Sequence, residues 1–545
     1  MFFKKMMFMK KINQSILGVV FLGLGILSLV SCIDETEPMN GTATTKQIER
    51  SPSATRALAN ALPAYFNYVW NRSAHYSFGY GAIMHIRDVM TADMAIAESN
   101  YDQFDMYEKN TYLGTEYQSV QFIWNYYYGF VLAANNLVGG VNPESATSEQ
   151  LGYLGVGYAF RALCYLDLAR MYEFLPNDKF TDGKNEVGNT VTNLTVPIVT
   201  DQTSEQDARN TPRATRDQMK EFILSDLNKA EQYIGKLTDT SGKIMPDSAC
   251  VLGLKARFYM WIEDYPHAQE YARKAINASK LSPMTQEQAL NTTTGFNVND
   301  PWMWGAKQTS DDISVRTGII NWTSFASNET SFGYAGGGGV YSMIGRAIYD
   351  RISDTDWRKL EWKAPTGSTL ADKVSFLSST YKQQLPTYAS VKFRPGSGND
   401  RESSVAAATC YPIMRVEEMY FIEAEAAAHQ NAATGKQLLE TFMKTYRDPS
   451  YTTSASTQDE VIEEVVFQKR VELWGEGQSF YDIKRLNYSV TRSYQGNNFY
   501  ELCRFNTNGR PAWMNIVLVR NETNNNKGVV GYNNPNPSDK YQPIP

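Results

Sequence analysis

The chain has 545 residues, with 52 basic side chains, 58 acidic side chains and a formal net charge of −6. An acidic chain without basic runs argues against nucleic-acid binding, where neutralising phosphates dominates affinity, and against adhesion to an anionic membrane by charge alone. Hydrophobic residues make up 42% of the chain, which is enough for a large core.

Residues 1–31 have the pattern of a lipoprotein signal peptide. Four lysines precede an uncharged run at 16–30, and the sequence LVSC occupies 29–32. A basic head, a short apolar stretch and a small residue before the cleavage site are typical of a secretory signal. As a helix the run would rise about 22 Å, short of the roughly 30 Å hydrocarbon core. LVSC resembles a bacterial lipobox, which implies cleavage before Cys32 and acylation there; an ordinary signal peptide is the alternative.

The residues after Cys32 favour a lipid-anchored protein at the cell surface. Several acyl chains would anchor it stably, since one chain alone is marginal. Residues 32–50 are polar, so we expect a tether. Asp34, Glu35 and Glu37 resemble the surface-export signal of Bacteroidota lipoproteins.

Helical periodicity dominates residues 51–290, which we predict to be an N-terminal helical part. Apolar residues recur at spacings of three and four in 115–138 and in 148–176. The second segment has the stripe Leu154, Tyr158, Ala162, Tyr165, Leu168 and Tyr172. In 250–277, small and aromatic residues stand at the offsets of a tetratricopeptide helix pair. Several such pairs in one chain indicate a helical array.

Residues 291–545 form the predicted C-terminal part, packed with the first as one globular unit. Gly, Ser, Thr, Asn and aromatic residues prevail up to about 410, and YAGGGGVYS at 334–342 excludes a regular element there. Helices are predicted again at 411–430 and 457–477, the second beginning with a capping box.

Four cysteines follow Cys32 without a CxxC, and we expect mostly buried thiols.

Five stretches follow the residue order of one protein family: FRALCYLDLARMYE (160–173), TVPIVT (195–200), ATRDQMKEFILSDLNKAEQYI (214–234), PIMRVEEMYFIEAEAAA (412–428) and VFQKRVELWGEGQSFYDIKR (466–485). Together they resemble the SusD/RagB family of outer-membrane nutrient-binding lipoproteins. The last stretch is the most specific. Lys469 and Glu173 depart from the family pattern without affecting the fold it implies.

The resemblance implies a mainly α protein with a SusD-like fold, in which tetratricopeptide-like helix pairs support an irregular, loop-rich half. It also implies a partner, a TonB-dependent outer-membrane barrel to which the lipoprotein delivers an oligosaccharide or another nutrient. Two alternatives stay open: the same scaffold delivering peptide or another nutrient, and a lipid-anchored glycoside hydrolase. No nucleic acid is expected as a partner, and no cofactor is expected.

Charged residues of the family motifs stand among large apolar residues, and buried charges must pair. We therefore expect buried salt bridges between helices, with a catalytic carboxylate network as the alternative. The residues are Arg415, Glu418, Arg470, Glu472, Glu476, Asp482 and Arg485.

The sequence carries no strong catalytic or metal signature. The four histidines lack zinc-motif spacing, and neither a GxSxG elbow nor a Walker A loop occurs. The pairs Asp88 with Asp93 and Asp354 with Asp356 could serve a glycosidase, which needs two carboxyls about 5–10 Å apart. The segment around Asp350 lacks the glycine and glutamate of an EF-hand calcium loop. We predict a binding protein without catalytic residues or a metal site.

A sugar offers an apolar face and a rim of hydroxyls, which aromatic rings and amide side chains on loops can bind. Two loop-rich regions of the sequence supply such residues. They resemble the regions that converge on the ligand in SusD-like proteins. We predict that Tyr101, Trp322 and Tyr334 stack on the ligand. Asn100 and Asn321 are predicted to hydrogen-bond it.

Overall fold

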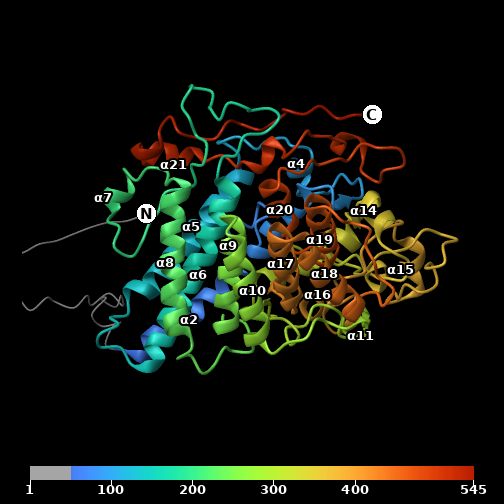
Figure 1. Cartoon of the computed structure of the whole chain (residues 1–545), viewed down its shortest axis with the longest axis horizontal. Helices are drawn as coiled ribbons and strands as arrows, with labels where there is room; N and C mark the ends of the chain where they lie inside the picture. The colour runs from blue at the N-terminus through green and yellow to red at the C-terminus, as the bar shows by residue number, and fades with distance from the viewer. Residues whose placement is uncertain (1–50) are drawn as a thin grey trace, which may run out of the picture. The chain divides into compact units, whose positions relative to one another are not determined.

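The computed structural model describes residues 51–545, most of which lie in helices and loops (Figure 1). The predicted signal peptide, Cys32 and the tether lie outside the described residues. None of the helices between 51 and 545 is both long and apolar enough to cross a membrane. All described residues belong to one compact unit, and the boundary at 290 stays a prediction.

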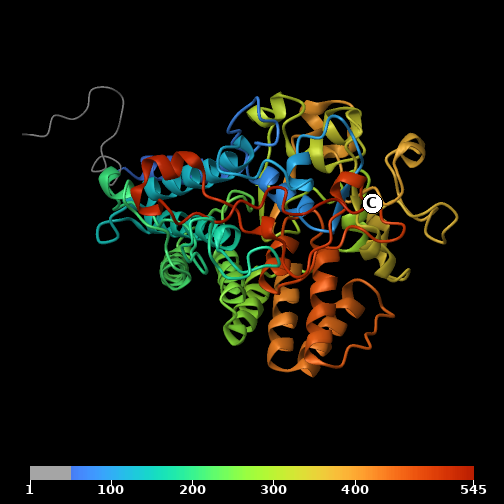
Figure 2. The same cartoon turned by 90° about the horizontal axis from the view of Figure 1, so that it is seen from above.

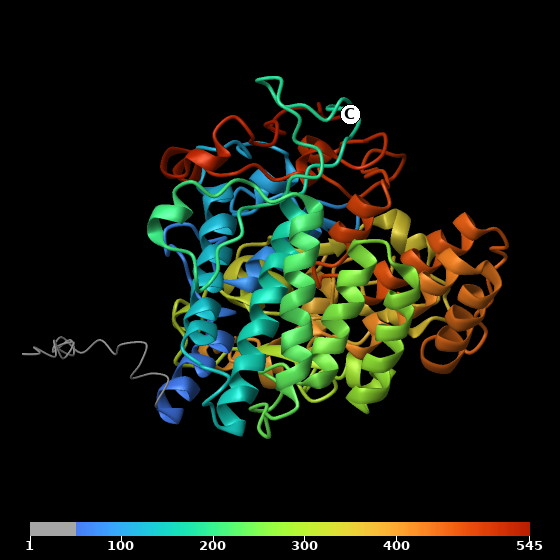
Figure 3. The same cartoon turned by 60° about the vertical axis from the view of Figure 1, so that its left-hand side comes forward.

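Six long helices of the N-terminal part pack side by side (Figure 3). The helix α6 contacts α2, α5, α8 and α9, and α9 and α10 form the predicted antiparallel pair. They are α2 (Pro52–Tyr65), α5 (Gln118–Gly139), α6 (Ser148–Tyr172), α8 (Arg216–Ile234), α9 (Ser248–Trp261) and α10 (Tyr265–Ser279).

The helix α6 is the centre of this array because it is apolar on every side. All six residues of its predicted stripe are buried, and so is most of the rest of the helix. Gly152 and Gly155 let it touch the end of α8, since added Cβ atoms would lie 2.7 Å from Leu237 N and 2.6 Å from Ile234 N. A capping box formed by Thr147 and Gln150 begins the helix.

Four helices of the C-terminal part extend the array: α17 (Val416–Gln430), α18 (Ala432–Tyr446), α19 (Gln458–Glu472) and α20 (Ser479–Arg485). The helix α17 packs on α9, α10, α18 and α19 (orange in Figure 2). The predicted capping box of Thr457 and Glu460 is confirmed. The helix predicted from 411 begins instead at Val416, because residues 410–414 form strand β4.

Short elements fill the loop-rich half. Before α5 and between α6 and α8 these are α3 (Tyr80–Val89), β1 (Met94–Ile96), α4 (Asp105–Glu108) and α7 (Glu205–Ala208). Residues 286–414 contain α11 (Gln286–Leu290), β2 (Trp304–Lys307), α12 (Ile313–Arg316), α13 (Trp322–Ala326), η1 (Gly333–Gly337), β3 (Ser342–Ile344), α14 (Arg346–Arg351), η2 (Trp357–Glu361), α15 (Ser379–Gln384), η3 (Gly396–Gly398), α16 (Ser403–Ala406) and β4 (Cys410–Met414). The end of the chain has η4 (Glu501–Cys503), η5 (Ala512–Met514), α21 (Arg520–Asn525) and η6 (Lys527–Val529). The glycine run was predicted to be irregular, and it contains one turn of π-helix, η1.

Two small antiparallel sheets join distant parts of the chain. Strand β1 pairs with β3 in the register Met94 to Ile344, and β2 pairs with β4 in the register Lys307 to Cys410. The first sheet holds the loop after β1 against the glycine run, which decides where the candidate site forms.

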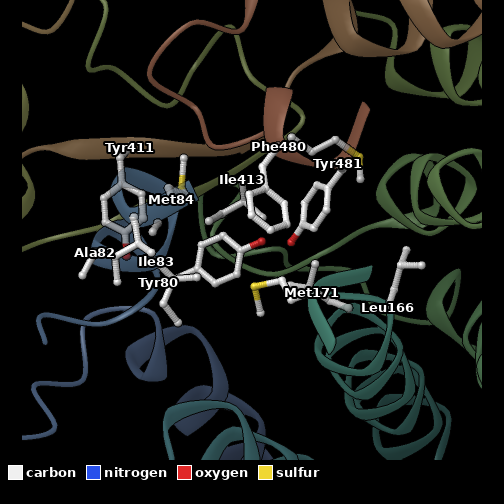
Figure 4. Close-up of a cluster of buried hydrophobic side chains, with 14 of the residues drawn as sticks. Tyr80, Ala82, Ile83, Met84, Leu166, Met171, Tyr411, Ile413, Phe480 and Tyr481 are labelled. Atoms are coloured by element: carbon white, nitrogen blue, oxygen red, sulfur yellow. The ribbon is translucent and has the colours of Figure 1, made fainter. Parts of the chain in front are cut away.

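The core is continuous between the helical array and the loop-rich half. Side chains of α3, α6, β4 and α20 meet there (Figure 4). The Tyr80 and Tyr481 hydroxyls point toward one another in Figure 4, and Tyr80 donates to Asp167 Oδ2 at 2.7 Å. This contact links α3 to α6 at the centre of the molecule.

The predicted buried salt bridges are confirmed. Arg415 on the N-terminal side of α17 donates to Glu476 Oε2 at 2.9 Å and contacts Glu472 at 3.1 Å. Glu418 accepts from Arg257 of α9 at 2.7 Å. Of the remaining motif charges, half-buried Arg470 binds Asp93 in the loop after α3. Asp482 binds Lys469 of α19 and, within α20, Arg485.

The carboxylates considered for catalysis all have structural partners. Asp88 accepts from Gly477 N at 2.9 Å, and Asp93 binds Arg470. Asp354 binds Lys359 at 2.8 Å, and Asp356 binds Arg358 at 2.6 Å. The four cysteines from Cys164 onward are free thiols, three of them buried and Cys410 half-buried, as predicted.

Candidate functional site

An exposed tyrosine caps a column of four aromatic rings that reaches the core. Tyr101 is 48% exposed and stacks on buried Tyr334, with ring centroids 5.0 Å apart and an interplanar angle of 29°. Tyr334 stacks on Phe325 at 4.3 Å, and Phe325 stacks on Phe78 at 5.2 Å. The column therefore presents one flat apolar face to solvent on a support that cannot easily move.

We call the exposed Tyr101 ring and the rings stacked beneath it the aromatic platform. Two segments far apart in the sequence build it. Ser99 Oγ donates to Gly338 O at 3.2 Å, and Ala97 N donates to Tyr341 O at 2.9 Å. Gly338 must be a glycine for close contact, since an added Cβ would lie 3.0 Å from Tyr101 Cδ1 and 2.8 Å from Tyr334 O. These contacts bring the two loop regions together, and their convergence on a ligand stays a prediction.

A third segment fixes the buried ring. The Tyr334 hydroxyl hydrogen-bonds Nδ1 of half-buried His75, in the loop before α3. Tyr334 N donates to Ser324 Oγ at 3.0 Å. Both bonds orient Tyr334, and through it the outer ring.

Two amide side chains stand close to Tyr101 in the sequence. Asn100 is exposed beside Tyr101, so its carbonyl and amide can accept and donate hydrogen bonds. Gln103 Nε2 donates to Tyr101 O at 3.4 Å, and Tyr101 N donates to Ser99 Oγ at 3.1 Å. The loop is thus held by its own polar groups.

The carboxyl next to Tyr101 belongs to Asp102. Asp102 Oδ1 accepts from Phe104 N at 2.8 Å, and Oδ2 is buried. Burial raises the pKa of Asp102, and burial together with Asp102 raises the pKa of neighbouring Glu108. The Asp102 carboxyl is therefore held by the loop rather than offered to a ligand beside Tyr101.

The structure corrects the placement of three predicted ligand contacts. Trp322 is only 2% exposed, stacks on Tyr411 at 5.1 Å and meets Phe393 edge-on at 5.3 Å. Asn321 is buried, and its side chain caps α13 by accepting from Ser324 N at 3.0 Å. Neither offers a surface to a ligand here, because residues 321–330 form part of the core rather than a surface loop. Tyr334 is also fully buried, so the prediction that it stacks on a ligand is corrected too; its ring supports Tyr101.

Sequence reasoning missed a second exposed ring of similar construction. Tyr68 is 44% exposed and stacks on Tyr65 at 4.9 Å, and Tyr65 stacks on Phe130 at 4.8 Å. The helix α2 ends at Tyr65 and leaves Tyr68 outside it. The rings behind Tyr334 had no distinguishing sequence signal.

Two family models match this chain. One, described as "SusD family", matches residues 367–545, and one described as "Starch-binding associating with outer membrane" matches residues 67–260. The two matches cover both the helical array and the C-terminal motifs. The chain belongs to the SusD family.

Known relatives of this SusD-family protein are distant in sequence. The SusD-like protein P38 of Formosa agariphila is 24% identical over 282 residues, which are 51% of this chain and 49% of that protein. The chain thus matches about half the length of this curated relative.

Solved structures share the fold of this SusD-family chain. A SusD-like carbohydrate binding protein from Bacteroides vulgatus superposes with a TM-score of 0.68 at 23% identity, covering 88% of this chain and 97% of that one. A SusD superfamily protein from Bacteroides thetaiotaomicron gives a TM-score of 0.67 at 18% identity, covering 89% and 100%. The predicted mainly α, SusD-like fold is confirmed.

Between residues 51 and 545 the SusD-family chain has no group of three or more His, Cys, Asp or Glu side chains placed to hold a metal ion.

Proposed function

We propose that this protein is a cell-surface lipoprotein that binds a carbohydrate and delivers it to a TonB-dependent outer-membrane transporter. The observation that carries the binding function is the exposed Tyr101 ring, fixed on buried Tyr334 and flanked by exposed Asn100. The matched family description, which names starch binding and the outer membrane, supports the ligand class and the location.

The platform suits a pyranose ring. The C–H face of a sugar packs on a flat aromatic ring, and its hydroxyls need donors and acceptors at the ring edge. Tyr101 supplies the first and the Asn100 amide supplies the second. Because the four-ring column holds Tyr101 in place, little conformational entropy is lost on binding.

The proposals of a lipid anchor and of a transporter partner rest on the sequence rather than on the platform. The lipobox ending in Cys32 supports anchorage, and the family resemblance supports the transporter.

Calorimetric titration of the purified protein with a panel of oligosaccharides and peptides tests the ligand class. Maltoheptaose serves as the starch probe, and xylan, mannan and pectin fragments and mixed peptides complete the panel. Saturable binding of a glycan without release of shorter sugars supports the proposal. Binding of peptides alone favours the peptide-delivering alternative, and sugar release favours the glycosidase.

A further inference from the structure

A cation-rich cavity of about 170 Å³ lies away from the aromatic platform, between α6, α9, α17 and α20. Seven cationic and four acidic side chains line it. The cations are Arg170, Arg216, Arg257, Lys469, Lys484, Arg485 and Arg510; the acids are Glu173, Glu263, Glu418 and Asp482. An excess of cations is unexpected here, since the whole chain is acidic.

The lining carboxylates are already engaged by part of this cation set. Arg257 binds both oxygens of Glu418, with contacts of 2.7 and 2.6 Å. Asp482 binds Lys469 at 2.9 Å and Arg485 at 3.2 Å. Behind the lining, Glu425 binds Arg485 and Asp167 binds Arg170. The lining Glu173 lies 3.5 Å from Arg216, and its Oε1 has no hydrogen-bond partner among residues 51–545.

Two further cations have no carboxylate partner among residues 51–545. Buried Lys484 donates to the backbone oxygen of Met171 at 2.9 Å, and half-buried Arg510 donates to Asn487 Oδ1 at 3.0 Å. Both acceptors are neutral. Burial lowers the pKa of Lys484 and that of Arg510, and the nearby Glu173 carboxylate, which raises both, does not offset burial.

Hydrogen-bond donors in the wall are also unused. Within the described part of the chain, Nη1 of Arg257 and Nη1 of Arg485 are buried and have no hydrogen-bond partner. Arg257 itself is only 3% exposed. Leaving a buried charged donor unsatisfied costs free energy, and an anion in the cavity would remove that cost.

We propose that this cavity binds a tetrahedral oxyanion, sulfate or phosphate, either free or as the ester of a small sugar. A sulfate or phosphate group has several acceptor oxygens, which suit the fork of donors that arginine presents. The volume accommodates such a group, and the more exposed Arg216 and Glu263 mark the entrance. Chloride could neutralise charge but could not satisfy several donors at once.

The proposed anion site is separate from the aromatic platform. No ring of the Tyr101 column lines the cavity. Loss of anion binding would leave the proposed glycan site untouched, and loss of glycan binding would leave the anion site untouched.

The test is titration calorimetry of the full chain at low ionic strength with sodium sulfate and sodium phosphate, against sodium chloride at equal ionic strength. Glucose 6-sulfate, glucose 6-phosphate and glucose distinguish a free anion from an esterified sugar. We expect saturable binding of at least one oxyanion, a higher melting temperature than in chloride, and no binding of glucose in this cavity.

Arg510→Gln and Lys484→Met should each weaken oxyanion binding by about tenfold or more, since each removes a charge without a carboxylate partner. The matched control is Arg351→Gln, an arginine paired with Glu463 on the surface, which should bind as the wild type does. Because Lys484→Met could fail to fold, Arg510→Gln alone is sufficient. No oxyanion binding by the wild type, or equal binding by Arg510→Gln, would overturn the proposal.

Discussion

Tyr101 stacks on Tyr334 at 5.0 Å, although the two residues belong to loops far apart in the sequence. The contact depends on the pairing of β1 with β3 and on the absence of a side chain at Gly338. An exposed ring would normally be free to rotate, but this one rests on a second ring whose hydroxyl and backbone are both hydrogen-bonded. The proposed binding surface is therefore rigid before a ligand arrives.

Trp322→Ala should lower the stability of the fold and should not remove a contact to the ligand. Trp322 is almost fully buried between Tyr411 and Phe393, and truncation of such a residue costs about 3–5 kcal/mol. Urea denaturation measures the loss, and at temperatures where the variant stays folded it should still bind glycan. An unchanged melting temperature combined with lost binding would instead place Trp322 in the site.

Gly338→Ala should weaken glycan binding while the fold survives. The new methyl group would press on Tyr101 and on the Tyr334 carbonyl, so the outer ring must shift. We expect about fivefold weaker binding, or about 1 kcal/mol. Gly235→Ala is the control, because the nearest atom to its added Cβ is Ser248 Oγ at 3.8 Å. Wild-type affinity in Gly338→Ala would show that the position of Tyr101 does not matter.

The carboxylate of Asp167 should make the fold sensitive to acid. Burial alone would raise its pKa, but Arg87, Arg170 and hydrogen bonds from Tyr80 and Tyr127 outweigh burial and lower the pKa to about 2. A carboxylate whose folded pKa lies below its unfolded pKa, roughly 3.9, stabilises the fold above that unfolded value. That stabilisation is lost as the pH falls from about 4 to about 2.

The contribution at neutral pH is on the order of 2 kcal/mol. Denaturant titrations at pH 7, 4 and 2 should therefore show a smaller fall in unfolding free energy for Asp167→Asn than for the wild type. The variant should also be less stable at pH 7, because its arginine partners lose their counter-charge. Equal acid sensitivity in both proteins would contradict this role.

Cys32→Ala should leave the protein unprocessed or release it from the membrane. The lipobox predicts that this thiol carries the acyl chains, and the acidic chain has no basic surface run that could replace them. Membrane fractionation at high salt, followed by mass spectrometry of the amino terminus, measures the outcome. A substituted protein held fully in the membrane fraction would refute lipid anchorage at this position.

The sequence predicted the helical array well because its signals are local. The α6 stripe, the α9–α10 pair and the Thr457 capping box depend on residues three to nine positions apart. The buried charges were also predictable, since charged residues inside an apolar motif must find partners.

The candidate site was only partly predictable because it depends on contacts between distant segments. Tyr101 and Trp322 both stand in polar, aromatic-rich stretches, yet the structure exposes the first and buries the second. Which ring faces solvent is decided by the pairing of β1 with β3 and of β2 with β4. The cationic cavity was missed because its residues come from six helices and four loops.

The most direct test compares Tyr101→Ala with Tyr68→Ala by calorimetry, using the panel glycan that the wild type binds most tightly. Both tyrosines are about half exposed and both stack on an inner ring, so the two variants lose similar surface. We predict that Tyr101→Ala weakens binding by about tenfold or more, while Tyr101→Phe and Tyr68→Ala stay within about twofold of the wild type. Wild-type affinity in Tyr101→Ala, or loss of binding only in Tyr68→Ala, would contradict the assignment of the site.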